Sequence, residues 1–161
     1  MSKNKQPKLT KLLAPTVPLV LEVEADNPER PHRLELDLAW TMRAVIIMES
    51  KLRQMGVELN VLQNPGIFWT GIDFTRLALG IWACSQQEQP EYADEEGFDI
   101  ITSFMTMDNY AAAVKALKDA FLESLTKERR EELRRLEAEA EQVLLNAQKP
   151  AADPTEAQVE K

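Results

Sequence analysis

His32 and Cys84 are the side chains whose chemistry could support catalysis, because they are the single histidine and the single cysteine of the chain. A catalytic triad needs a nucleophile, a base and an orienting acid that meet in the fold, and nothing beside His32 in the sequence suggests one. A reactive thiolate needs cationic neighbours, whereas the surroundings of Cys84 are acidic. We therefore expect an exposed strand position for His32, interior packing for Cys84, and no enzymatic activity.

Residues 94–99, with the sequence DEEGFD, are the candidate for a metal site. An EF-hand calcium loop needs oxygen ligands at its first, third and fifth positions and glycine at its sixth. Counting from Asp94, Gly97 falls at the fourth position and Phe98 at the fifth, so the pattern fails. The positive end of a helix dipole explains carboxylates at a helix start. Because glycine-rich phosphate loops are also absent from the sequence, we predict no metal and no cofactor.

The charge pattern is more informative than these single residues. Residues 77–114 contain no lysine or arginine but carry seven carboxylates. A surface of one sign favours a basic partner and repels the phosphates of nucleic acid. We therefore expect a docking surface for a basic protein and no binding to nucleic acid. The carboxylates are Glu88, Glu91, Asp94, Glu95, Glu96, Asp99 and Asp108.

The length and composition predict one domain with a tail. A chain of 161 residues is too short for two ordinary domains, and its net charge of −8 with 44% hydrophobic residues is typical of a globular protein. One cysteine fits a reducing cytosol. No segment approaches the roughly 18 apolar residues of a membrane span. Pro15 and Pro18 interrupt the short apolar run that a secretory signal would need. We therefore expect a cytoplasmic protein without a membrane partner.

Four segments are predicted along the chain. They are a flexible basic arm at 1–11, a single domain at 12–125, an amphipathic helix at 126–147 and a disordered tail at 148–161. The domain is predicted to be mainly α with a small N-terminal β-hairpin, in which alternating apolar residues form one buried face. Those residues are Val17, Leu19, Leu21, Val23, Leu34, Leu36 and Leu38.

A bundle of about four helices should follow the hairpin. The spacing of apolar residues predicts them at 39–55, 74–87, 94–105 and 108–125. We expect Asp37 to cap the first helix, Asp73 to precede the second, Asp108 to cap the fourth and Thr126 to cap the C-terminal helix. Gly56 should end the first helix. The expected apolar face of that first helix comprises Met42, Val45, Ile46, Leu52 and Met55.

Large apolar side chains are expected mainly in the core. This holds for Trp40, Trp69 and Trp82, because each tryptophan buries much area and lies in an apolar segment. Among the methionines, Met105 and Met107 are the best surface candidates because they end a helix. In the C-terminal helix, a narrow seam could support self-association or binding of a partner. The seam comprises Leu133, Leu136, Ala140, Val143 and Ala147.

Four segments in order carry a resemblance to a known family. They are residues 33–52 (RLELDLAWTMRAVIIMESKL), 73–83 (DFTRLALGIWA), 90–105 (PEYADEEGFDIITSFM) and 111–121. Together they resemble the tail assembly chaperones of long-tailed bacteriophages. The resemblance covers about ninety residues. In that family a short β-element leads into a helix with an acidic residue, here Glu49, and a helix of the RLALGIWA kind precedes a proline loop and an acidic helix start. Residues 51–62 depart from the family pattern.

The resemblance implies a chaperone that binds the tape measure protein, keeps it soluble and helps to recruit tail tube protein in the host cytoplasm. Such a protein is absent from the mature virion. We expect helix-in-groove binding with acidic residues that attract a basic client. The candidate contact residues are Trp82, Glu91, Asp94, Glu95, Glu96, Met105, Met107 and Tyr110. Two alternatives remain open: a small structural connector or tail completion protein of the virion, and an acidic regulatory protein that mimics nucleic acid.

Overall fold

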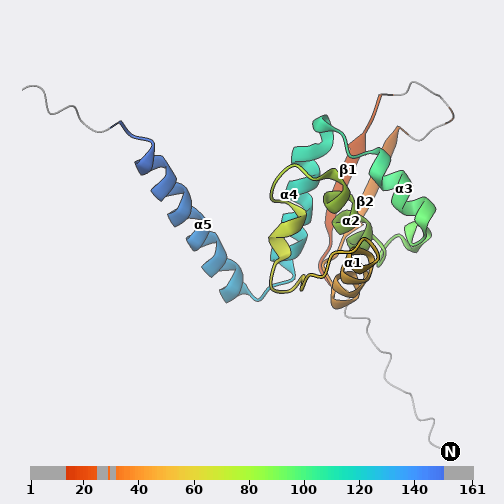
Figure 1. Ribbon diagram of the computed structural model, residues 1–161, viewed down its shortest axis with the longest axis horizontal. Helices are drawn as coiled ribbons and strands as arrows, with labels where there is room; N and C mark the ends of the chain where they lie inside the picture. The colour runs from red at the N-terminus through yellow and green to blue at the C-terminus, as the bar shows by residue number, and fades with distance from the viewer. Residues whose placement is uncertain (1–13, 25–28, 30–31, 151–161) are drawn as a thin grey trace, which may run out of the picture. The chain divides into compact units, whose positions relative to one another are not determined.

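The computed structural model describes residues 14–24, 29 and 32–150, and it confirms a mainly helical fold with an N-terminal antiparallel hairpin (Figure 1). The predicted arm at 1–11 and residues 151–161 of the predicted tail lie outside the described residues. The chain divides into two compact units between Ser124 and Leu125. In order, the elements are β1 (Val17–Glu22), β2 (Arg33–Leu38), α1 (Met42–Gln54), η1 (Pro65–Phe68), α2 (Phe74–Ser85), η2 (Pro90–Tyr92), α3 (Glu95–Ser103), α4 (Met107–Glu123) and α5 (Lys127–Ala147).

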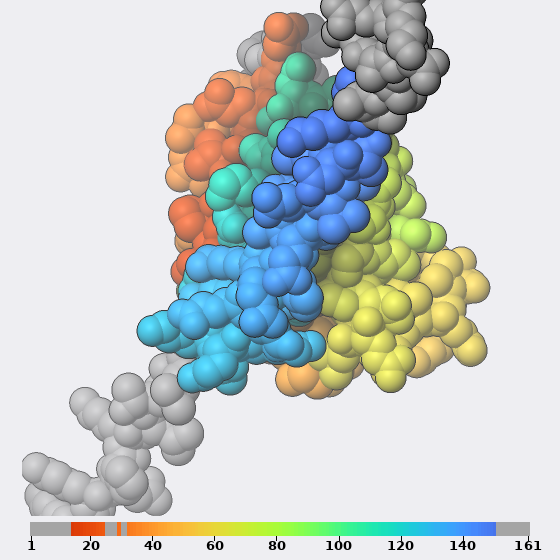
Figure 2. All heavy atoms as spheres, turned by 90° about the vertical axis from the view of Figure 1, so that its left-hand side faces the viewer, coloured from red at the N-terminus to blue at the C-terminus, as the bar shows by residue number. Residues whose placement is uncertain are grey.

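The hairpin forms because its apolar residues alternate. Leu19 pairs with Leu36 and Leu21 with Leu34, so their side chains share one face of the sheet, and all four are buried. α4 packs against β1, and α2 packs against β2. These two helices together cover the apolar face of the hairpin. In Figure 2 the first half of α4 (teal) lies beside the hairpin (red and orange). The predicted single buried face is therefore confirmed.

α1 begins three residues later than predicted, and its buried face agrees with the expected one at Val45 and Leu52 only. Met55, also expected on that face, is 47% exposed. Thr41 is the N-cap and accepts a hydrogen bond from the Ala44 N–H (3.1 Å), so the assignment of Asp37 as cap was wrong. Asp37 belongs to β2 instead. Met42 and Ile46 are 59% and 63% exposed. The buried side chains of α1 are Ala44, Val45, Met48 and Leu52.

Gly56 ends α1 as predicted. Its φ of +79° lies in the left-handed region, which glycine adopts at low cost. The Gly56 N–H donates to the Arg53 carbonyl (3.0 Å) and the Val57 N–H to the Leu52 carbonyl (2.9 Å). These two bonds are a Schellman motif, which satisfies the last carbonyls of the helix.

α2 is the central helix of the first unit. It begins directly after Asp73, as predicted, and Asp73 is its N-cap, accepting from the Arg76 N–H (3.0 Å). Every residue from Leu77 to Ser85 is buried. A helix buried on all sides packs against several neighbours, and α2 contacts α1, α3, α4 and β2. Gly80 permits the approach of α4, since a Cβ at that position would lie 2.6 Å from Leu117 Cδ2.

α4 begins at Met107, and its cap was also mispredicted. Thr106 is the N-cap and accepts from the Asn109 N–H (3.3 Å), while Asp108 lies in the first turn. A carboxylate in that turn still interacts favourably with the helix dipole. Tyr110 Oη donates to the Gly71 carbonyl (2.5 Å) and thereby ties α4 to the segment before α2.

Aromatic rings fill the core beside α4, as expected for the tryptophans. Trp40 is 6% exposed, and its ring meets Phe68, Trp69 and Phe121 at centroid distances of 6.2, 5.9 and 5.2 Å. These pairs are edge-on, which is the geometry that aromatic quadrupoles favour. Trp69 is half-buried, and Trp82 packs against α3 and η2 at another place in the core.

α5 is described by itself, because it belongs to the second unit. Thr126 caps it as predicted by accepting from the Arg129 N–H (3.3 Å), and the helix contains no buried residue. Pairs such as Arg129–Glu132 (2.6 Å) and Arg135–Glu139 (3.6 Å) link successive turns. Within the described part of the chain, no helix is both long enough and apolar enough to cross a membrane.

Candidate docking surface at the acidic corner

The predicted acidic residues gather where η2 meets the start of α3. We call this surface the acidic corner and define it by its carboxylates, which are Glu91, Asp94, Glu95, Glu96 and Asp99. All five residues are exposed. Asp94 is also the N-cap of α3, because its side chain accepts from the Gly97 N–H (2.8 Å). The helix start therefore fixes Asp94, and the remaining acids project from the first turns of α3 and from η2.

A tight contact between Gly97 and Tyr92 sets the shape of the acidic corner. A Cβ on Gly97 would lie 2.2 Å from the Tyr92 carbonyl oxygen, closer than any real side chain could come. The same oxygen accepts a hydrogen bond from Trp82 Nε1 (2.5 Å). The ring of Trp82 also packs edge-on against Phe98 at 5.3 Å. α2 thus holds both η2 and α3 through one tryptophan.

Lys51 of α1 supplies a positive charge that the local sequence pattern did not reveal. Its Nζ lies 2.5 Å from Glu95 Oε1, and it lies 5.9 and 5.2 Å from the ring centres of Trp82 and Phe98. The Lys51 side chain is 16% exposed, whereas that of Glu95 is 73% exposed. An ammonium ion near two ring faces and a carboxylate is attracted to all three. The expected absence of counter-charges is therefore wrong for Glu95.

Three carboxylates of the acidic corner have no such constraint. The side chains of Glu91, Glu96 and Asp99 are exposed and make no hydrogen bond or ion pair with another described residue. The five acids with Lys51 leave a net formal charge of −4. Exposed charges attract an oppositely charged partner, and salt screens that attraction. The corner can therefore bind a basic surface.

The other predicted contact residues are not part of this surface. Trp82 is 7% exposed and Met105 is 9% exposed, so both are core residues. Tyr110 is half-buried and bonded to Gly71. Met107 is 66% exposed, but it follows the opposite end of α3 from Glu95. The structure thus brings the carboxylates and Trp82 together and leaves Met107 and Tyr110 apart from them.

Sequence reasoning missed the exposed side of α1. Met42 and Ile46 are one helical turn apart, and both are exposed although the spacing predicted them in the core. A polar hollow lies between α1 and the following connector, lined by Glu49, Arg53, Val57, Glu58, Leu59 and Asn60. Glu49 at this place accepts a hydrogen bond from the buried Val61 N–H (2.9 Å). Its role in the fold is therefore to hold the connector.

The residues considered for catalysis lie apart from the acidic corner or inside the core. His32 is exposed immediately before β2, as expected, and Cys84 is fully buried. Burial raises the pKa of the Cys84 thiol because the thiolate would lose its hydration, so the thiol is inert. Within the described residues, no three His, Cys, Asp or Glu side chains are grouped to hold a metal ion.

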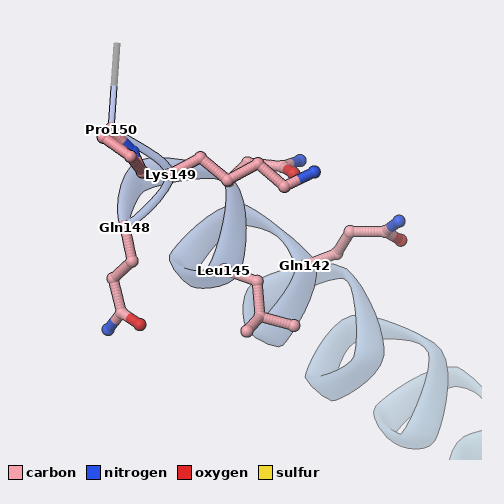
Figure 3. Close-up of a pocket in the computed structure, with 6 residues that line it drawn as sticks. Gln142, Leu145, Gln148, Lys149 and Pro150 are labelled. Carbon is pink, nitrogen blue, oxygen red and sulfur yellow. The ribbon is translucent and has the colours of Figure 1, made fainter. Parts of the chain in front are cut away.

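A second hollow lies at the C-terminal end of α5. Leu145 and Gln148 point to the same side of the helix there, as Figure 3 shows. Its six lining residues are all exposed, so it is an open surface of one helix end. They are Gln142, Leu145, Asn146, Gln148, Lys149 and Pro150.

Comparisons of the chain with protein-family models, with curated proteins and with solved structures found no match.

Proposed function

We propose that this protein is a tail assembly chaperone of a long-tailed bacteriophage. It binds the tape measure protein in the host cytoplasm, keeps that long helical chain soluble and helps to recruit tail tube subunits. It leaves before the virion is complete. The proposal includes no reaction and no cofactor.

The acidic corner is the observation that carries this proposal. Asp94 caps α3 and Glu95 pairs with Lys51, so their positions are also explained by the stability of the fold. The side chains of Glu91, Glu96 and Asp99 make no comparable hydrogen bond or ion pair with another described residue, and they form an exposed surface of one sign. A surface of this kind steers a basic helix towards the protein and suits transient binding, because charged contacts accelerate association more than they slow dissociation.

The order of the elements also supports the proposal, through the resemblance of four segments to tail assembly chaperones. The four similar segments form β2 with α1, then α2, then η2 with α3, and then α4, all within the first unit. RLALGIWA (residues 76–83) lies entirely inside α2, and Pro90 is the first residue of η2, before the acidic start of α3. The similar residues therefore build the core that supports the acidic corner, and the client would be recognised by the exposed acids.

Coexpression with the neighbouring tape measure gene tests the proposal. We expect the tape measure protein to be soluble and to copurify with this protein, and to aggregate when it is expressed alone. If the tape measure protein is equally soluble without this chain, the proposal fails. Mass spectrometry of purified particles provides the second measurement, because a chaperone is absent from finished tails. Its presence at stoichiometric amounts would favour a connector or completion protein.

A charge-reversal pair tests whether the acidic corner is the contact. Glu91→Lys with Glu96→Lys should weaken binding of the tape measure protein by about tenfold or more, because two attractive charges become repulsive. Glu24→Lys with Glu58→Lys is the matched control, since it makes the same charge change at exposed positions outside η2 and α3, in loops. Equal weakening by both pairs would show that net charge, and not this surface, determines binding.

A further inference from the structure

α3 has the fewest buried residues of the four α-helices of the first unit. They are Gly97 and Ile101, whereas α1 has four buried residues, α4 has five and α2 has nine. α3 packs mainly on α2 and on η2. Segments with few buried contacts open at a lower free energy than the core of a protein. We therefore expect part of α3 to open before the rest of the first unit unfolds.

The two ends of α3 differ in how they are held. Towards the C-terminal end, Ile101 is fully buried and the adjoining Phe104 is 1% exposed. The Phe104 carbonyl also accepts a hydrogen bond from Asn109 Nδ2 of α4 (2.9 Å). At the N-terminal end, Glu95 and Glu96 are exposed. The C-terminal end is therefore fixed in the core, and the N-terminal end is the part that can open.

η2 and the first turns of α3 form one body, which we call the flap and define as residues 90–100. The backbone of Gly97 lies so close to the Tyr92 carbonyl that a Cβ would come within 2.2 Å of its oxygen. Trp82 of α2 meets both parts of the flap, since its Nε1 donates to the Tyr92 carbonyl (2.5 Å) and its ring packs against Phe98 at 5.3 Å. Opening of the flap therefore breaks both contacts with Trp82.

Lys51 joins the flap to α1 and α2. Its Nζ lies 2.5 Å from Glu95 Oε1 and 5.2 Å from the ring centre of Phe98, and both of these residues belong to the flap. The same atom lies 5.9 Å from the ring centre of Trp82 in α2. The Lys51 side chain is 16% exposed, so its ammonium ion lies at the junction of the three segments. There it stabilises the closed arrangement through the carboxylate and through both rings.

We propose that Lys51 is a latch that holds the flap closed against α2. When the latch releases, the flap opens by local unfolding, while Ile101 and Phe104 stay in the core. Opening uncovers the ring of Trp82, which is 7% exposed in the closed protein. The flap carries all five carboxylates of the acidic corner, so the latch also determines whether that surface is ordered. This inference does not depend on the proposed function, because it concerns the stability of one segment of the fold.

Native-state hydrogen exchange of the full chain tests the latch. Lys51→Ala should speed exchange of the flap amides at residues 98–100 by about tenfold, because the open form has already lost the contacts of Lys51. Glu49→Ala is the matched control on the same helix. It removes a hydrogen bond to the Val61 N–H that persists when the flap opens, so exchange at residues 98–100 should change by less than about twofold.

Two outcomes of this measurement would overturn the proposal. Equal acceleration by Lys51→Ala and Glu49→Ala would show that the amides at residues 98–100 exchange through global unfolding of the first unit. Unchanged exchange in Lys51→Ala would show that this side chain does not hold the flap closed.

A double variant tests whether Glu95 acts through Lys51. Glu95→Gln removes the charge and keeps the length of the side chain, so it should speed exchange at residues 98–100 by about fivefold. Adding Glu95→Gln to Lys51→Ala should speed exchange by less than about twofold further, since the pair is already broken. Effects that multiply in the double variant would contradict the latch. Circular dichroism of each variant reports whether the chain is folded.

Discussion

Gly97, Tyr92 and Trp82 show how a single residue can determine the shape of a surface. The carbonyl of Tyr92 lies against Gly97 and accepts the indole N–H of Trp82, so η2 has no room to move towards α3. Gly97 is needed because of this contact and not because of its backbone angle, since its φ is not positive. The acidic corner therefore depends on the absence of one methyl group.

Gly97→Ala should lower the free energy of unfolding by about 1–3 kcal/mol, because the added Cβ must displace the backbone of η2. Chemical denaturation measures the loss. Gly66→Ala is the matched control, since a Cβ there would meet its nearest neighbours at an ordinary 3.7 Å. Its effect should be near zero. Equal stabilities of the two variants would show that η2 moves freely.

Cys84 should resist thiol reagents in the native protein. Burial raises the pKa of the thiol, so the folded state keeps its proton at pH values where the unfolded chain ionises. Stability is therefore full below the ordinary thiol pKa of about 8.5 and falls as the pH rises above it. Labelling should be roughly a thousandfold slower in native than in denaturing buffer. Equally fast labelling in both buffers would contradict a buried Cys84.

At the scale of elements, local rules predicted some boundaries and missed others. Thr126 caps α5 and α2 begins directly after Asp73, both as expected, because each residue is the cap-forming side chain closest to its apolar run. Asp37 and Asp108 do not cap, because Thr41 and Thr106 lie nearer to the true helix starts. Periodicity alone could not choose between two suitable cap residues a few positions apart.

The buried face of α1 was predicted only in part, for a related reason. Val45 and Leu52 are buried as expected, but Met42 and Ile46 are exposed, and Ala44 and Met48 occupy the core instead. Both sides of α1 carry apolar residues, and the sequence alone does not show which side α2 covers. Tertiary packing determines which side is buried.

The hairpin shows how its edges are protected. Pro18 provides no N–H on β1, and Asn109 Nδ2 donates to the Glu22 carbonyl (2.8 Å). On β2, the Asp37 N–H donates to Gln89 Oε1 (3.2 Å). These features disfavour the addition of a further strand. Partners of this protein should therefore bind through side chains, which agrees with a helical client.

Glu49 should stabilise the connector between α1 and α2 through one hydrogen bond. Glu49→Ala leaves the buried Val61 N–H without its acceptor, which costs about 1–3 kcal/mol. Glu49→Gln keeps a carbonyl acceptor and should cost much less. Hydrogen exchange at the Val61 amide measures the local effect. Unchanged exchange in Glu49→Ala would show that another group satisfies this N–H.

At the scale of the whole molecule, charges that are far apart in sequence determine the acidic corner. The acids were predictable because all five lie within residues 91–99, but Lys51 lies forty-four positions before Glu95. A count of charges within a short stretch of sequence around Glu95 cannot include Lys51. The same limit applies to Trp82, whose apolar sequence context predicted a core residue but not its bond to Tyr92.

The first unit should fold without α5. Every buried residue of the described chain lies in the first unit, so a chain ending at Leu125 keeps the whole core. Its free energy of unfolding, measured by denaturant titration, should equal that of the full chain within about 0.5 kcal/mol. A chain ending at Ala116 is the control, because it lacks the buried Leu117 and Ala120 and should fail to fold. A large loss of stability in the longer fragment would mean that residues after Leu125 contribute to the stability of the first unit.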